Sequence, residues 1–446
     1  MTSDRFDALD DLIAAAGAGA GESPETRRLR RLRWERGLGF AAAAVALAGF
    51  LTEVVASSIV VADGGPTALA VVWPLSGLAL LALAHLQGRY VDRFARVPVV
   101  VALCVADAAL FLVVLALFAG DVSPTVPAAL AALLGDQMNF LLPVIIGALA
   151  GDVFTAGQGA TVFPRLARWG IGGQVGGLLV GASMPLVLDE TAWLLVLPPA
   201  LLMAVAVVVP RALRDASVSG GHQRAESSGE SLRSTIGFVR ELPAFRWLLR
   251  ASLLVIAAGT ALEFGFLDVL HSEFTDPAEL QMVFAGTALV GFVVGAVVQT
   301  TVTPRVLTRR SVGGALGVLP VVGVAAALVM AAGGAVDVLP AVVVGVLAWR
   351  LPRWGLDPSA RQAAYATLPD ERRARVAMLL DLVPTALGQV LVPVSLGLGL
   401  LVGGHWIGPL VAAAVASTGA WAARRVSATW DDTQLSYRLK RRRRIA

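Results

Sequence analysis

The sequence predicts an all-α polytopic membrane protein with twelve transmembrane helices in two six-helix bundles. Three observations support this fold class: the composition, the length of the apolar blocks and the charge of the loops. Of the 446 residues, 57% are hydrophobic and 15% are charged, and the mean hydropathy is +0.74. A soluble domain has about 25% charged residues. The apolar residues occur in blocks of about twenty, the length of a helix that crosses a bilayer.

The apolar blocks form two sets of six. The first set occupies residues 37–61, 67–86, 97–119, 127–150, 169–188 and 192–210, and the second occupies 245–270, 279–303, 311–332, 338–352, 376–401 and 407–423. These blocks predict five parts: a cytoplasmic N-terminal segment (1–36), an N-terminal bundle (37–210), a cytoplasmic linker (211–244), a C-terminal bundle (245–423) and a basic cytoplasmic tail (424–446).

The loop charges test this count independently. Loops after the even-numbered segments carry arginines, whereas loops after the odd-numbered segments contain no lysine or arginine. Cytoplasmic loops of membrane proteins are enriched in Lys and Arg. The alternation therefore predicts that both termini are cytoplasmic.

Several other classes of protein are disfavoured. The net charge of +4 is explained by the cytoplasmic loops, so we expect no nucleic acid as a partner. The chain has one lysine, Lys440, so it cannot form the phosphate-binding loop of an ATPase. The four histidines are scattered without zinc spacing. We expect no enzyme activity, no cofactor and no metal.

A signature loop lies between the second and third segments. It reads Gly88-Arg-Tyr-Val-Asp92-Arg93-Phe-Ala-Arg96. This spacing resembles the signature loop of the major facilitator superfamily, in the position where that fold carries it. The resemblance implies a major-facilitator fold and a gating loop formed by Gly88, Asp92, Arg93 and Arg96. The alternative is an ordinary basic loop.

Two longer stretches resemble a branch of that superfamily. Residues 160–182, ATVFPRLARWGIGGQVGGLLVGA, and 357–381, DPSARQAAYATLPDERRARVAMLLD, are similar to segments of the bacterial relatives of the ATP/ADP antiporter-type nucleotide transporters. The resemblance covers residues 35–425 and implies a carrier in a bacterial cytoplasmic membrane.

Glycines are concentrated in the fifth segment. Gly172, Gly173, Gly176, Gly177 and Gly181 form overlapping pairs with the spacing G-x-x-x-G. Small residues at this spacing allow helix backbones to approach closely in lipid. We expect them to pack against a neighbouring helix, with a sliding gate as the alternative.

Ionisable and polar groups inside the segments are the candidate site. Charges at bilayer depth are costly and usually face a cavity or a partner. The candidates for substrate binding or proton coupling are Glu53, Asp107, Asp136, Asn139, Glu263, Gln174, Gln389 and Arg350. The alternative is that some of the acids are hydrogen-bonded packing groups. We interpret Asp268 and Asp381 as solvated or capping residues near helix ends, and Arg350 as more consistent with a helix-end arginine that reaches toward the interface.

These features favour a secondary active transporter that works by alternating access. We expect its partners to be membrane lipids, a small-molecule substrate and protons. ATP and ADP are disfavoured because the segments contain no lysine to pair with phosphates. The alternatives are a nucleotide or other organic-anion exchanger, and a scaffold or sensor of the same fold that does not transport.

Overall fold

The computed structural model describes residues 23–90, 95–154, 156–188, 190–216, 228–309, 312–368, 370–400 and 404–445. Within these ranges the chain is helical and contains no strand. The first half comprises α2 (Pro24–Tyr90), α3 (Arg96–Phe118), α4 (Thr125–Asp136), η1 (Gln137–Leu141), α5 (Leu142–Val153), α6 (Ala156–Ser183), η2 (Met184–Leu186), η3 (Thr191–Val196) and α7 (Leu197–Leu213). The second half comprises α8 (Ser228–Glu241), α9 (Pro243–Glu273), α10 (Pro277–Thr301), α11 (Thr303–Arg309), α12 (Val312–Leu316), α13 (Val318–Ala335), α14 (Leu339–Gly355), α15 (Asp357–Tyr365), α16 (Asp370–Leu400) and α17 (Ile407–Ile445).

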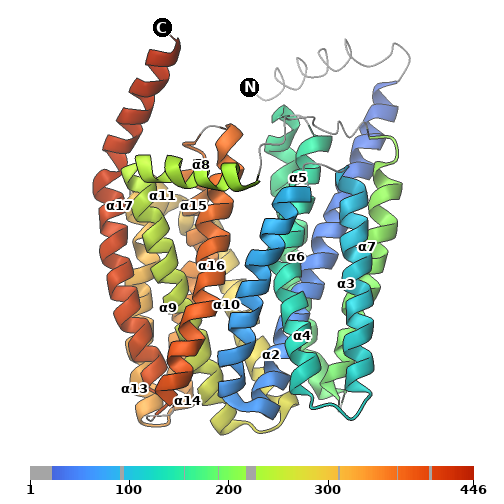
Figure 1. Ribbon diagram of the computed structural model, residues 1–446, viewed down its shortest axis with the longest axis vertical. Coiled ribbons are helices and arrows are strands. Elements are labelled where there is room, and N and C mark those ends of the chain that lie inside the picture. Colours follow the sequence, from blue (N-terminus) through green and yellow to red (C-terminus); the bar gives the residue numbers. More distant parts are fainter. Residues whose placement is uncertain are drawn as a thin grey trace.

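The long helices run along one axis and form two bundles, one from each half of the chain (Figure 1). Eight helices of the described residues are long and apolar enough to cross a membrane. One of them, α2, contains the first two predicted segments, which are separated by a kink at Gly65. The predicted segments thus lie on helices, while the count of twelve crossings stays a prediction.

The kink in α2 explains how two segments follow each other without a loop. Gly65 has a φ of 69° and a ψ of 176°, a combination that is open to glycine and strained for other residues. Pro66 follows it and cannot donate a backbone hydrogen bond. This Gly-Pro pair reverses the chain at the end that carries Asp63.

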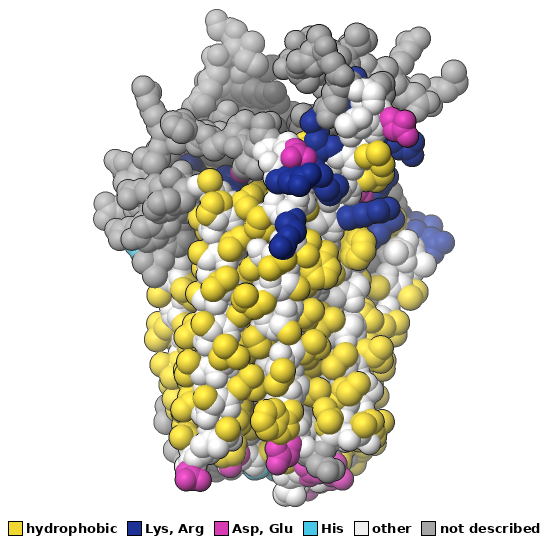
Figure 2. Space-filling view, turned by 90° about the vertical axis from the view of Figure 1, so that its right-hand side faces the viewer, with side chains coloured by type: hydrophobic (Ala, Val, Ile, Leu, Met, Phe, Trp, Pro, Cys, Tyr) yellow, Lys and Arg dark blue, Asp and Glu magenta, His cyan; other side chains and the backbone are white. Residues whose placement is uncertain are grey.

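The two ends of the molecule differ in charge. Figure 2 shows lysine and arginine side chains gathered at one end with a few acidic ones among them, aspartate and glutamate side chains without basic ones at the opposite end of this face, and an apolar band between them. Helix α2 begins and α17 ends on the same side, which is the basic end (Figures 1 and 2). We call these the basic end and the acidic end.

Parts of the predicted linker and tail are structured. Helix α8 lies across the basic end of the second bundle (Figure 1), and Val239 and Leu242 belong to a buried cluster with Phe245. Helix α17 continues past residue 423, where Val426 and Trp430 are buried in the same cluster. The second bundle therefore includes residues that we expected in the linker and the tail.

Candidate functional site

A cavity of about 380 Å³ lies between the two halves. Its polar lining comes from both halves: Glu53, Ser57, Asp136, Asn139 and Gln174 from the first, and Thr260, Glu263, Arg350, Arg353, Thr385 and Gln389 from the second. Aromatic side chains complete the wall, namely Phe50, Trp73, Phe140, Phe284, Trp349 and Trp354. Of the eight predicted binding or coupling residues, seven line this cavity.

Arg350 is a buried basic residue of the cavity wall. Its side chain is 3% exposed, and its Nε and Nη2 donate to the two carboxylate oxygens of Glu263 at 2.9 and 2.6 Å. The rings of Phe266, Phe284 and Trp354 lie 5.5–5.6 Å from its guanidinium carbon, within range of cation–π attraction. The interpretation of Arg350 as a helix-end arginine reaching toward the interface is therefore wrong. Glu263 and the three rings hold it inside the bundle.

Glu53 is supported by an amide. Asn139 Nδ2 donates to Glu53 Oε2 at 2.8 Å, and the glutamate side chain is open to the cavity. Asn139 lies directly over Gly49, where a Cβ atom would come within 2.1 Å of Asn139 Oδ1. Gly49 is therefore needed for this contact between α2 and η1.

Asp136 is bonded across the two halves. Gln389 Nε2 on α16 donates to Asp136 Oδ2 on α4 at 3.2 Å. Asp136 immediately precedes the π-helical turn η1. Pro143 lies at the start of α5 and has no N–H to donate to the carbonyl four residues earlier, which favours such a turn. π-helical turns are frequent at functional sites.

Asp107 does not share the cavity. It is 2% exposed and accepts a hydrogen bond from Gln137 Nε2 at 3.2 Å, and it is not among the residues that line the space between the halves. The structure thus separates Asp107 from Asp136, although the sequence presents both as carboxylates in the middle of a segment.

The predicted gating loop falls only partly within the described residues. Asp92 and Arg93 lie outside them, and Gly88 lies in the last turns of α2. Arg96 donates to the carbonyl oxygen of Ala148 at 2.9 Å and forms an ion pair with Asp152. These bonds join the start of α3 to α5 within the first half.

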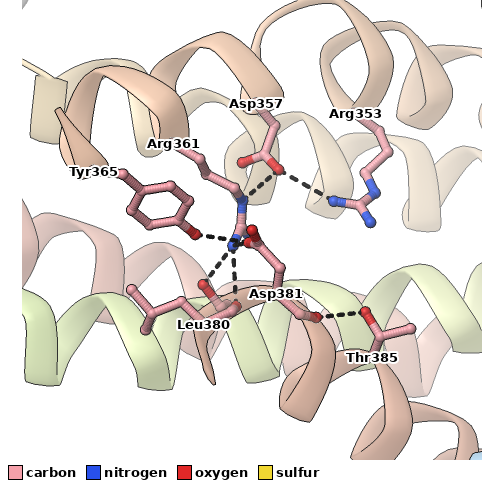
Figure 3. Close-up of polar contacts among 8 residues, drawn as sticks. Arg353, Asp357, Arg361, Tyr365, Leu380, Asp381 and Thr385 are labelled. Carbon is pink, nitrogen blue, oxygen red and sulfur yellow. Dashed lines mark hydrogen bonds and ion pairs between the residues drawn. The ribbon is translucent and has the colours of Figure 1, made fainter. Parts of the chain in front are cut away.

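A second polar cluster, which the sequence interpretation missed, lies on α15 near the basic end of the second half (Figure 1), and Figure 3 shows its polar contacts. Arg361 Nε donates to Asp357 at 2.7 Å, and its Nη1 donates to Ser252 Oγ at 2.8 Å and to Asp381 at 3.1 Å. Tyr365 donates to the same Asp381 oxygen at 2.7 Å. Burial and the Asp381 carboxylate raise the pKa of Tyr365 above its ordinary value, so this phenol remains a donor.

This cluster adds a role to Asp381 and explains a sequence pattern. The Asp381 side chain is half exposed, as expected for a solvated residue, and it also ties α16 to α15. Arg353, Asp357 and Arg361 are spaced four residues apart, and both ion pairs form. That spacing places side chains on one helix face. It was the signal in the sequence from which the ion pairs of this cluster could have been predicted.

Asp268 is buried and paired. Its side chain is 7% exposed, and Oδ2 lies 2.7 Å from His405 Nδ1 at the acidic end. The prediction that Asp268 is solvated or caps a helix is therefore wrong.

Several contacts hold the halves together toward the acidic end. Gln281 Nε2 on α10 donates to the carbonyl oxygen of Gly181 on α6 at 2.9 Å. A Cβ atom on Gly397 would come within 2.7 Å of Ala70 Cβ. The rings of Trp73 and Phe264 pack edge to face at 6.2 Å nearer the cavity.

Comparisons with known proteins identify the architecture. No family model and no curated sequence matches this chain. A solved structure of a mutant of the nucleoside transporter NupG superposes with a TM-score of 0.67 at 13% identity, covering 88% of this chain and 99% of that one. The chain has the major-facilitator fold.

Other solved structures agree. A bacterial homologue of the iron transporter ferroportin, in an inward-facing state, gives a TM-score of 0.64 at 15% identity, covering 89% of this chain and 99% of that one. An auto-inhibited POT family peptide transporter gives a TM-score of 0.64 at 12% identity, covering 89% of this chain and 97% of that one. These neighbours differ in what they transport, and at such identities they establish the fold alone.

Proposed function

We propose that this protein is a secondary active transporter that moves a small solute by alternating access. The observation that carries the proposal is the cavity between the halves, which is lined by Glu53, Asp136, Glu263 and Arg350. In transporters built from related halves, a central site is exposed to each side in turn as the halves rock. Contacts near the acidic end favour a state that is closed on that side.

Protons are the coupling ions that we propose. Glu53 and Asp136 accept hydrogen bonds from the amides of Asn139 and Gln389, and amides do not neutralise their charge. A carboxylate at bilayer depth without a cation is costly. Each group can avoid that cost by taking up a proton, so solute and proton would bind in exchange.

Nucleotides are disfavoured as substrates. Nucleoside di- and triphosphates carry about three or four negative charges, which need buried cations. Arg350 already donates to both carboxylate oxygens of Glu263, and Glu53 and Asp136 would repel phosphates. The sequence resemblance to the ATP/ADP antiporter-type carriers would then not extend to the substrate. Saturable uptake of labelled ATP that requires Arg350 would contradict this part of the proposal.

Distances between spin labels would test alternating access. One pair joins Asp121→Cys to Glu273→Cys at the acidic end, and the other joins Arg168→Cys to Arg305→Cys at the basic end, both in a Cys104→Ala background. We expect the two distances to change in opposite directions with pH or with solute. Distances that stay fixed under all conditions would favour the scaffold or sensor interpretation.

The proposal includes an orientation. The basic end, where α2 begins and α17 ends, would face the cytoplasm of a bacterial cell. The 1–36 segment, the 211–244 linker and the 424–446 tail would then be cytoplasmic too. The Gly88–Arg96 loop would then close the cytoplasmic side, with Asp92 as its central group. Reporter fusions at each terminus measure the orientation, and a C-terminus outside the cell would contradict it.

A further inference from the structure

The charges around the cavity do not balance. Arg353 donates a hydrogen bond to Asp357 at 3.1 Å. Its positive charge is therefore paired with a residue that does not line the cavity. Arg350 is engaged by Glu263 in a two-bond pair. Glu53 and Asp136 remain, each bonded to an amide. When all the named acids are ionised, the cavity therefore holds two negative charges that its own arginines do not neutralise.

A divalent metal ion is a poor fit for this imbalance. Among the described residues, no group of three His, Cys, Asp or Glu side chains is arranged to hold a metal ion. Hard divalent cations require six or more oxygen ligands or several retained waters. The cavity that holds the carboxylates is instead lined by the rings of Phe50, Trp73 and Phe140 as well. Aromatic rings attract organic cations that are weakly hydrated.

One of the buried donors without a hydrogen-bond partner belongs to a residue of the cavity wall. Arg350 Nη1 makes no hydrogen bond within the described residues, although the side chain is only 3% exposed. Buried donors are nearly always satisfied. Because this donor belongs to a residue of the cavity wall, a ligand with a hydrogen-bond acceptor would satisfy it.

We propose that the substrate is an organic monocation whose positive centre lies between Glu53 and Asp136, against the aromatic wall, and which competes with a proton for these carboxylates. This inference rests on the proposed transport function. One monocation with one proton balances the two charges, and so do two protons. Exchange of the cation for a proton therefore leaves the cavity neutral in both loaded forms. The groups that face this site are Glu53, Asp136, Glu263, Arg350 and Arg353.

The test uses the purified full chain and a pair of probes with the same shape and opposite charge, tetraphenylphosphonium and tetraphenylborate. Binding is measured by equilibrium dialysis with labelled probe and by thermal stability, which rises when a ligand binds the folded state. We expect saturable binding of the phosphonium and none of the borate. We also expect phosphonium affinity to fall as pH decreases from 8 to 5, because protons then occupy the carboxylates.

Variants locate the binding. Glu53→Gln and Asp136→Asn should each weaken phosphonium binding by roughly tenfold or more, since each removes one partner of a desolvated charge pair. Glu279→Gln is the matched control, because Glu279 is an exposed residue in the first turn of α10. It should bind as the wild type does. If one cavity variant fails to fold, the other variant and the wild-type pH dependence still decide the question.

Three results would overturn the proposal. Equal binding of both probes, or equal phosphonium binding by wild type and both cavity variants, would indicate non-specific partition. Failure of the phosphonium to bind at any pH would reject a cationic substrate. If Ala-Ala or uridine then stabilised the protein and the spin-label distances still alternated, the cation assignment would fail while the transport proposal stood.

Discussion

The contact between α6 and α2 gives the sharpest prediction about the fold. A Cβ atom on Gly173 would lie 2.1 Å from the carbonyl oxygen of Ala43 and 2.9 Å from its Cα. Both atoms belong to helix backbone, so neither can move aside as a flexible side chain would. At the adjacent Gly172, a Cβ atom would meet nothing within 4 Å. The two glycines therefore form a matched pair for one added methyl group.

We predict that Gly173→Ala destabilises the first bundle and that Gly172→Ala does not. Overpacking a tight contact costs about 1–3 kcal/mol, and a clash with backbone belongs at the upper end. Replacing a helical glycine by alanine otherwise gains up to about 1 kcal/mol. Combining the two effects, we expect the free energy of unfolding to fall by about 2 kcal/mol in Gly173→Ala and to rise by up to about 1 kcal/mol in Gly172→Ala.

Thermal unfolding followed by tryptophan fluorescence would measure the difference in one detergent. For a domain of 150–250 residues, each kcal/mol corresponds to roughly 2–4 °C. The two variants should therefore differ in Tm by roughly 6–12 °C, with Gly173→Ala the lower. Equal Tm values would refute the packing argument. Unchanged stability with altered spin-label distances at the basic end would instead assign this contact to the sliding gate.

Three further predictions concern the polar groups. Arg361→Met should lower the free energy of unfolding by about 1.5–3 kcal/mol, because the buried Asp357 loses its hydrogen bond from Arg361 and keeps only the one from Arg353. Arg305→Met at an exposed position should have little effect, and similar Tm values of the two variants would contradict this prediction. Asp136→Asn should shift the pH dependence of solute uptake and Asp107→Asn should not, because only Asp136 lines the cavity; the reverse pattern would exchange their roles. Hydrogen bonds from the hydroxyls of Thr125 and Ser123 hold the pKa of Asp63 below its ordinary value. Because Asp63 is exposed, Asp63→Asn should lower the free energy of unfolding by less than about 1 kcal/mol at neutral pH. That difference should disappear as pH falls through the folded-state pKa of Asp63, and a difference that persists in acid would exclude the ionised carboxylate as its cause.

The sequence specified the helical segments and the location of the charges because those properties are local. A run of about twenty apolar residues must form a helix in lipid whatever its neighbours are. The alternation of arginine-rich and arginine-free loops agrees with the charge at the two ends of the molecule (Figure 2). The sequence also identified the acids at bilayer depth, and of those named as binding candidates only Asp107 lies away from the cavity.

The tertiary structure decided which of these groups meet. Arg350 and Glu263 are 87 residues apart, and Asp136 and Gln389 are 253 residues apart, so no local pattern pairs them. Asp107 lies on α3, whose other residues from Val97 to Phe118 are apolar on every side, and such a helix gives no periodic signal of the face it presents to its neighbours. The rotation of each helix is instead set by close packing, as at Gly173 against Ala43. Sequence alone therefore determined that carboxylates lie in the membrane, and packing determined that Glu53 and Asp136 face a common cavity while Asp107 does not.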